Sequence, residues 1–289
     1  MATIFCFGLG FSAAALAARL REKSWGVIGT SRSIEKAADL AARGYDMHVF
    51  DGAGPLSDAS VLKPATHMLV SVPADDDGDA VLRWHARDIA ALPNLKWLGY
   101  LSTTGVYGDC NGDWVDETSP VRPDQQRSRR RAAAEAGWLA LQRDHGVPVH
   151  VFRLAGIYGP GRNQLEGVRR GTAHRIVKPG QVFCRIHVED IAAVLQASMA
   201  KPDPGAVYNV ADDEPAPPQD VVRYAAELLG VEPPPEVPFD AAQLSPMAAS
   251  FYADNRRVRN DRIKSELGVT LKYPTYREGL QALLTTVSR

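Results

Sequence analysis

The chain has 289 residues, of which 45% are hydrophobic, so it is long enough for one large domain or two interleaved ones. Its 33 basic and 34 acidic residues give a formal net charge of −1, which disfavours nucleic acid and anionic membrane surfaces as partners. The three cysteines are far apart and form no pair at metal-binding spacing, which excludes a disulfide scaffold and predicts no metal site. No uninterrupted apolar stretch is long enough to span a membrane.

Short apolar runs alternate with helical patterns through the first half of the chain, beginning with a predicted strand at 2–7, a glycine turn and a helix at 13–20. Further predicted strands are 25–30, 46–50, 67–72, 96–101 and 149–154, and further predicted helices are 34–42, 80–92 and 128–145. Strands that alternate with helices form a parallel sheet covered on both faces. The sequence therefore predicts an α/β fold of the Rossmann type, with a doubly wound parallel sheet.

The second half of the chain is punctuated by proline and glycine from Gly159 onward. It still contains predicted helices at 188–199, 218–229 and 277–287 and a predicted strand at 206–210. We assign residues 1–155 to a Rossmann-type core, to which the helix at about 188–200 returns, and residues 156–289 to a smaller C-terminal substrate lobe. The ligand is expected in the cleft between them, because open parallel sheets bind at the carboxyl ends of their strands.

Residues 1–18 also need an interpretation, because they carry no charge and end in small residues, much as a secretory signal does. A signal has a basic stretch ahead of its apolar run, whereas the first arginine here is Arg19. We therefore expect a cytoplasmic protein, with secretion as the alternative that N-terminal sequencing of the native product would test.

A candidate phosphate-binding turn lies between the first predicted strand and the first predicted helix. Gly8, Gly10 and Ala13 form the pattern GxGxxA there. Gly8 allows the tight turn, Gly10 lets the backbone approach a pyrophosphate, and Ala13 permits close packing of helix on strand. The free N–H groups at the start of the helix would bind the anion. The pattern predicts a dinucleotide site.

The residues after the second predicted strand bear on which dinucleotide binds. NAD is usually met there by an acidic residue, and this chain has none. Ser31 and Arg32 stand in its place, and a guanidinium beside hydroxyls suits a 2′-phosphate. We expect NADP, with NAD as the alternative; otherwise Arg32 is a solvated loop residue. Asp51 is expected to meet the adenine amino group, although an Asp before Gly52 is also a common turn residue.

Four further motifs follow in a fixed order. They are STTGVYG at 102–108, RLAGIYGPG at 153–161, RIHVEDI at 185–191 and YNV at 208–210. Together with the glycine turn, this order resembles the extended short-chain dehydrogenases/reductases, the epimerases and dehydratases of sugar nucleotides, over roughly residues 2 to 287. Family members often form homodimers through two core helices, so a homodimer is an expectation by analogy.

The resemblance also implies roles for residues near the fifth predicted strand. The hydroxyl at the position of Thr103 orients the reacting oxygen of the substrate in that family, and a Tyr-x-x-x-Lys pair on the next helix transfers the proton. Counting back from Glu135, which looks like the family's glutamate after that pair, places Arg127 at the Tyr position and Arg131 at the Lys position. An arginine cannot act as a general acid or base near neutral pH. The chain therefore resembles the atypical members of the family.

Several roles stay open at this point. Arg131 is expected near the nicotinamide ribose, and Tyr107 and Tyr158 are candidate substitute proton donors. The arginines at 127–131 form either a solvated helix end or a contact to an anionic substrate. We expect an NAD(P)-binding oxidoreductase or epimerase/dehydratase-like enzyme that acts on a small molecule. The alternative is a non-catalytic NADP(H) sensor, which the missing Tyr would explain.

Overall fold

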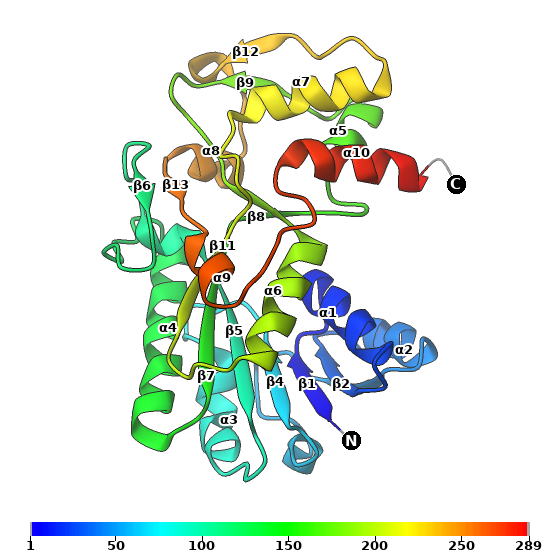
Figure 1. Cartoon of the computed structure of the whole chain (residues 1–289), viewed down its shortest axis with the longest axis vertical. Coiled ribbons are helices and arrows are strands. Elements are labelled where there is room, and N and C mark those ends of the chain that lie inside the picture. The colour runs from blue at the N-terminus through cyan, green and yellow to red at the C-terminus, as the bar shows by residue number, and fades with distance from the viewer. Residues whose placement is uncertain (1, 288–289) are drawn as a thin grey trace.

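A computed structural model describes residues 2–287 (Figure 1). Within these residues a seven-stranded sheet has the order β11-β7-β5-β4-β1-β2-β3, and every neighbouring pair of its strands is parallel. Its strands are β1 (Thr3–Phe7), β2 (Gly26–Ser31), β3 (Asp46–Val49), β4 (His67–Val70), β5 (Trp97–Thr103), β7 (Val149–Leu154) and β11 (Val207–Val210). The strand order reverses direction between β1 and β4, which places a topological switch point at the carboxyl ends of these two strands.

Helices cover both faces of this sheet (Figure 1). One face carries α1 (Phe11–Arg21), α2 (Ile34–Ala42) and α6 (Val188–Ala200), and the other carries α3 (Ala80–Ala90) and α4 (Gln126–His145). Leu16 and Ile191 belong to the buried cluster on the first face, whereas Val81 and Trp138 belong to the cluster on the second. The doubly wound α/β fold is therefore confirmed.

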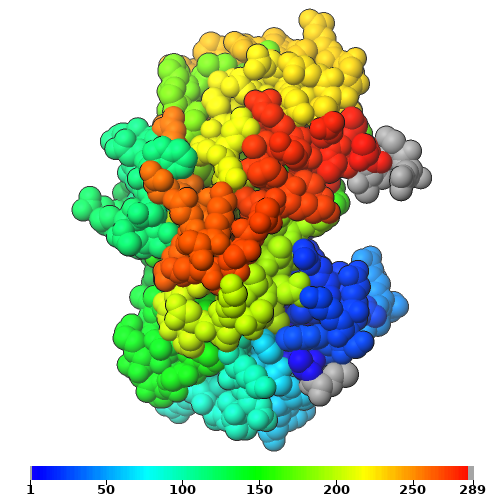
Figure 2. Space-filling view, in the orientation of Figure 1, coloured from blue at the N-terminus to red at the C-terminus, as the bar shows by residue number. Residues whose placement is uncertain are grey.

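A smaller lobe lies over the carboxyl ends of the strands (Figure 1). It contains α5 (Gln164–Arg169), β9 (Arg175–Val177), α7 (Pro218–Leu229), β12 (Glu236–Pro238), the 3-10 turn Phe239–Ala241, α8 (Pro246–Tyr252) and α10 (Tyr276–Val287). Leu165, Val221 and Leu280 belong to a buried cluster of its own, separate from the two core clusters. On the face shown in Figure 2 the surface is indented between α1 and α10, where core and lobe meet.

Three short strand pairs lie outside the seven-stranded sheet. They are β8 (Gly156–Tyr158) with β10 (Arg185–His187), β9 with β12, and β6 (Trp114–Val115) with β13 (Arg257–Val258). Two further 3-10 turns, Ala59–Leu62 and Thr104–Tyr107, follow β3 and β5. Each strand of the three short pairs has only two or three residues. The sequence therefore carries no periodic signal for these strands.

One boundary differs from the sequence-based division at residue 155. The division at residue 155 places residues 207–210 in the lobe. In the structure they form the edge strand β11 of the core sheet, because their backbone pairs with β7. The helix α9 (Asp261–Ser265) also packs against the core, where the Arg262 guanidinium donates to the Val207 carbonyl oxygen at 2.9 Å. Within residues 2–287, no helix is both long enough and apolar enough to cross a membrane.

Candidate functional site

The turn between β1 and α1 has the conformation that a phosphate-binding turn requires. Gly8 has a φ of +84°, which favours glycine, and its N–H donates to Thr30 Oγ1 at 2.8 Å. Gly10 is the N-cap of α1, and a Cβ added at this position would meet nothing within 4 Å. Ala13 is fully buried against the sheet. The first N–H groups of α1 therefore face open space into which an anion fits.

A cavity of about 300 Å³ lies in front of this turn. Gly8, Gly10, Ser31 and Arg32 line it together, and so does Lys36, which the sequence analysis did not single out. Lys36 lies one turn into α2 after the N-cap Ser33, so helical spacing from that cap could have identified it. No acidic side chain of residues 2–287 lines this cavity, and neither cation has an ion-pair partner among them.

Asp51 does not join these residues. Its Oδ1 accepts a hydrogen bond from the Ala53 N–H at 2.9 Å, and its side chain is exposed outside the cavity. The structure therefore shows Asp51 as a turn residue at the end of β3. Phe50, its buried neighbour, is the residue of this strand end that does line the cavity.

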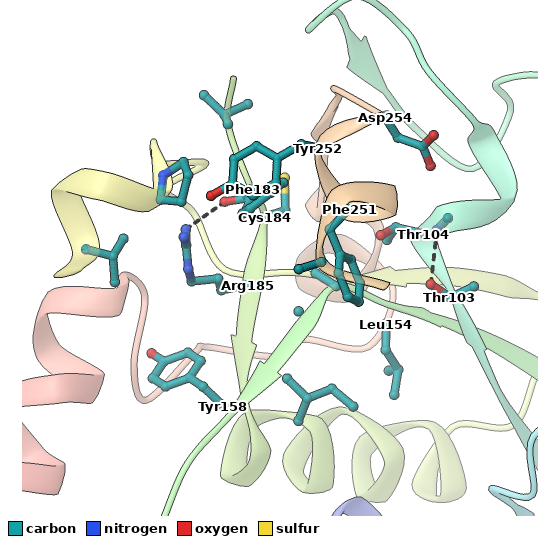
Figure 3. Close-up of a pocket in the computed structure, with 18 of the residues that line it drawn as sticks. Thr103, Thr104, Leu154, Tyr158, Phe183, Cys184, Arg185, Phe251, Tyr252 and Asp254 are labelled. Atoms are coloured by element: carbon teal, nitrogen blue, oxygen red, sulfur yellow. Dashed lines mark hydrogen bonds between the residues drawn. The ribbon is translucent and has the colours of Figure 1, made fainter. Parts of the chain in front are cut away.

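A larger cavity of about 1040 Å³ lies between core and lobe, and Pro73 lines both cavities (Figure 3). Thr103, Arg127 and Arg131 all line the larger cavity, although they come from β5 and from the first turns of α4. Arg127 and Arg131 are one helical turn apart and share a face of α4. The structure thus brings the predicted substrate-orienting hydroxyl and the two substituted positions together.

Each of these three side chains is held by a neighbour. Thr103 Oγ1 accepts from the Gly105 N–H at 3.1 Å, which leaves its own proton free for another acceptor. Arg131 Nη1 donates to the Leu101 carbonyl oxygen at 2.7 Å. Arg127 lies over the ring of Phe251, with its Cζ atom 4.0 Å from the ring centroid. Phe251 belongs to α8, so this contact joins the core to the lobe.

The two candidate substitute donors lie in different places. Tyr107 is buried outside the cavity wall, where its hydroxyl donates to Asn209 Oδ1 at 2.7 Å and accepts from Arg153 Nη1 at 3.0 Å. Tyr158 does line the cavity, and its hydroxyl faces the Thr275 carbonyl oxygen at 3.4 Å. Burial raises the pKa of both phenols above the ordinary value, so each is a weaker acid than an exposed tyrosine.

The larger cavity is strongly cationic. Its described lining includes six arginines (Arg127, Arg131, Arg162, Arg170, Arg185 and Arg256) and one carboxylate, Asp254. Of these arginines, only Arg256 forms an ion pair within residues 2–287. Arg185 donates to the carbonyl oxygens of Phe183 and Ala216, and burial lowers the pKa of its guanidinium. Such a lining attracts an anion.

Within the described part of the chain, no group of three or more His, Cys, Asp or Glu side chains is placed to hold a metal ion. The three cysteines are free, and burial raises the pKa of the Cys6 thiol to about 12. A thiol with so high a pKa is a poor nucleophile near neutral pH.

The sequence and fold of the chain are similar to those of known proteins. Residues 79–211 match the NAD dependent epimerase/dehydratase family. The structure of a conserved protein of unknown function from Silicibacter pomeroyi DSS is 53% identical, covers 100% of both chains and has a TM-score of 0.90. Protein YeeZ of Escherichia coli (strain K12) is 27% identical over 95% of this chain and 97% of its own.

A more distant solved structure shares the fold. The NAD complex of dTDP-glucose 4,6-dehydratase from Bacillus anthracis is 19% identical, with a TM-score of 0.78 over 100% of this chain and 97% of its own. The glycine turn, the order of the motifs and the parallel sheet agree with the family match. Residues 79–211 therefore resemble the NAD dependent epimerase/dehydratase family, and the chain as a whole has the fold of that dehydratase.

Proposed function

We propose that the chain is an NAD(P)-dependent oxidoreductase or epimerase/dehydratase-type enzyme that acts on a small anionic substrate carrying a hydroxyl or carbonyl group. One observation carries the proposal: the cavity in front of the phosphate-binding turn adjoins a larger cavity lined by Thr103 and by five arginines without acidic partners within residues 2–287. A pure nucleotide-binding module has no evident use for that second cavity.

NADP(H) is the cofactor that this cavity favours. Arg32 and Lys36 supply two free positive charges beside the Ser31 hydroxyl, and no carboxylate of the described chain competes for a ribose hydroxyl there. The open space at Gly10 leaves room for the pyrophosphate at the N-terminus of α1. A bound nicotinamide would supply the hydride chemistry, and Arg131 of α4 would hold its ribose.

The arginines of the larger cavity support an anionic substrate. Arg127, Arg162 and Arg170 have no carboxylate partner within residues 2–287, so a phosphate or carboxylate on the substrate can satisfy them. Phe251 packs against Arg127, and the aromatic rings of Phe251 and Tyr252 both line the cavity (Figure 3). The cavity thus suits a molecule with an anionic group on an otherwise apolar or ring-shaped body.

The test is a turnover screen. Wild-type protein is incubated with NADP(H) or NAD(H) and a panel of phosphorylated or carboxylated secondary alcohols and ketones, including sugar nucleotides, and NADPH absorbance is followed. Turnover of anionic members, absent for their neutral counterparts and reduced by Thr103→Ala, is the expected result. A chain that binds NADPH in calorimetry and turns over no member contradicts the proposal.

That contrary result would favour a second function, a non-catalytic module that binds NADP(H) and reports to a protein partner. The observation behind it is the pair Arg127 and Arg131, which replaces the proton-transferring pair of ordinary family members. The screen separates the two functions, because the sensor binds the cofactor without consuming it.

A further inference from the structure

Asp254 is the one acidic side chain among the described residues that line the larger cavity. It is 8% exposed, and its Oδ2 accepts from Arg256 Nη1 at 3.1 Å. No hydrogen bond from residues 2–287 reaches its Oδ1, which is not enclosed by the protein either. One carboxylate oxygen is therefore fixed, and the other is free to meet a ligand.

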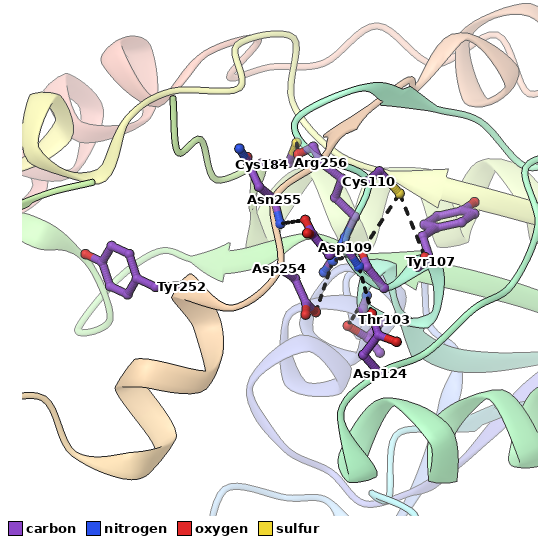
Figure 4. Close-up of polar contacts among 12 residues, drawn as sticks. Thr103, Tyr107, Asp109, Cys110, Asp124, Cys184, Tyr252, Asp254, Asn255 and Arg256 are labelled. Carbon is purple, nitrogen blue, oxygen red and sulfur yellow. Dashed lines mark hydrogen bonds and ion pairs between the residues drawn. The ribbon is translucent and has the colours of Figure 1, made fainter. Parts of the chain in front are cut away.

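The backbone around Asp254 is clamped on both sides. The buried Gln181 donates from Nε2 to the Asp254 carbonyl oxygen at 2.8 Å. The next residue, Asn255, donates its N–H to Asp109 Oδ1 at 2.8 Å and accepts at its carbonyl oxygen from the Cys110 N–H at 3.0 Å (Figure 4). This degree of anchoring fixes a side chain in one position, as acid–base chemistry requires.

The same hydrogen bonds connect Asp254 to the loop that carries Thr103. Arg256 Nη1 also donates to the Gly108 carbonyl oxygen at 2.7 Å, and Gly108 ends the 3-10 turn that follows Thr103. Figure 4 draws Asp254 close to Thr103, whereas in Figure 3, from another side, Thr104 lies between the two. Asp254 and Thr103 therefore line the same cavity, and the hydrogen bonds of Arg256 join the segments that carry them.

We propose that Asp254 is the proton-transferring catalytic residue of this chain and replaces the tyrosine that α4 lacks. The inference rests on the proposed function. Thr103 donates a hydrogen bond to the reacting oxygen and holds it in place, while the Asp254 carboxylate accepts a proton from that oxygen. Arg256 keeps the carboxylate in position.

The step balances as an ordinary alcohol oxidation. The substrate's secondary alcohol loses its C–H hydride to the oxidised nicotinamide, and its O–H proton passes to Asp254 Oδ1. The C–O single bond becomes a carbonyl, and the electron pair of the broken C–H bond leaves with the hydride. Reduction of a ketone runs the same transfers in reverse, with protonated Asp254 as the acid.

The chain offers a matched control for the test. Asp261 pairs with Arg259 at 3.4 Å, also two residues away, but on the surface and outside the cavity. The probe is the compound of the turnover panel that the wild type converts fastest. The variants are Asp254→Asn, Asp254→Gly and Asp261→Asn, and kcat, KM and the NADPH Kd are measured for each.

We expect Asp254→Asn to lower kcat by about 10²–10⁴, with KM and the NADPH Kd nearly unchanged. The low-pH limb of kcat/KM should disappear with it. Added formate should restore part of the activity of Asp254→Gly in proportion to its concentration, which a merely structural role would not produce. Asp261→Asn should behave as the wild type.

Two outcomes overturn the assignment while the proposed function stands. One is an Asp254→Asn protein that keeps the wild-type kcat. The other is a loss that appears in KM or in NADPH binding and that formate does not rescue, which would make Asp254 a positioning residue for Arg256. A wild type that converts no compound of the panel instead overturns the proposed function itself.

Discussion

Arg153 at the end of β7 and Glu135 in the middle of α4 form an ion pair that is almost closed to solvent. Arg153 Nη2 lies 2.8 Å from Glu135 Oε2, and the two side chains are 6% and 5% exposed. Ser102, at the end of β5, donates its hydroxyl to Glu135 Oε1 at 2.5 Å. The pair therefore fixes α4, with Arg127 and Arg131, against the strand that carries Thr103.

Removal of one partner should destabilise the protein strongly. Glu135→Gln leaves the Arg153 charge buried without a counter-charge, and we expect the free energy of unfolding to fall by about 3–5 kcal/mol. Urea unfolding followed by circular dichroism measures this loss. The control is Glu166→Gln, which breaks a pair with Arg169 that solvent reaches and should cost only about 0–1 kcal/mol. Equal losses in the two variants would contradict the argument.

Arg32 should determine the preference for NADP over NAD. A charge-assisted hydrogen bond contributes about 1.5–3 kcal/mol, so Arg32→Ala should weaken NADP binding roughly tenfold to a hundredfold and leave NAD binding nearly unchanged. Calorimetry with both nucleotides measures the two Kd values. Arg43→Ala, on the exposed C-cap of α2, serves as control. Equal affinities of the wild type for both nucleotides would refute the assignment.

The two substituted positions on α4 can be restored together. Arg127→Tyr with Arg131→Lys places a phenol and an ammonium where ordinary family members carry them, so turnover of ordinary family substrates should rise. If the wild type depended on the ordinary family mechanism alone, it would turn such substrates over about 10²–10⁴ more slowly than a tyrosine-bearing relative. Initial rates on sugar nucleotides provide the measurement.

Arg129→Tyr is the control for that variant, because Arg129 lies on the same helix outside the cavity lining. A rise in rate for Arg129→Tyr as well would show that the effect does not come from the cavity. No rise in the double variant would show that the helix register, counted back from Glu135, is wrong.

Stability should fall as the solution becomes acidic, in part because of His150. Burial lowers the pKa of this imidazole to about 4, while its Nε2 accepts from the Asp203 N–H at 2.8 Å. The unfolded chain takes up the proton near pH 6.5, so the folded state loses stability as pH falls from 6.5 toward 4. At pH 5 the titration of His150 alone should lower the free energy of unfolding by about 2 kcal/mol.

His150→Gln removes the titrating group while keeping an acceptor for Asp203. Urea titrations at pH 7 and at pH 5 measure the free energy of unfolding of both proteins. From pH 7 to pH 5, this free energy should fall about 2 kcal/mol less for His150→Gln than for the wild type. Identical slopes for wild type and His150→Gln would show that His150 does not contribute.

The parts of the fold that the sequence predicts well are those with local signals. The helices at 34–42 and 218–229 match the structure to the residue, because Ser33 caps the first and Gly230 ends the second in a left-handed conformation. The sequence predicts β11 as a strand but places it in the lobe instead of the core sheet. Its position depends on pairing with β7, which is far away in the chain.

The candidate site also contains some residues that local sequence patterns predict and others that they do not. Gly8, Gly10 and Arg32 meet at one cavity because a turn and the strand beside it bring them together, so motif spacing predicts their meeting. Phe251 contacts Arg127, and Asp254 lines the same cavity as Thr103, although both come from a segment that is remote in sequence and belongs to no motif. Only the packing of lobe on core places them there, which a single sequence does not encode locally.

The place of β11 also bears on how the chain is made. Until Val207–Val210 has left the ribosome, β7 keeps an open hydrogen-bonding edge, because its partner on that side has not yet been synthesised. Before α6 emerges, the apolar face that it covers is open as well. A nascent chain therefore cannot complete its N-terminal domain as that domain emerges. The interval between the synthesis of β7 and of β11 is the stage at which a neighbouring unfinished chain can add a strand of its own to that edge.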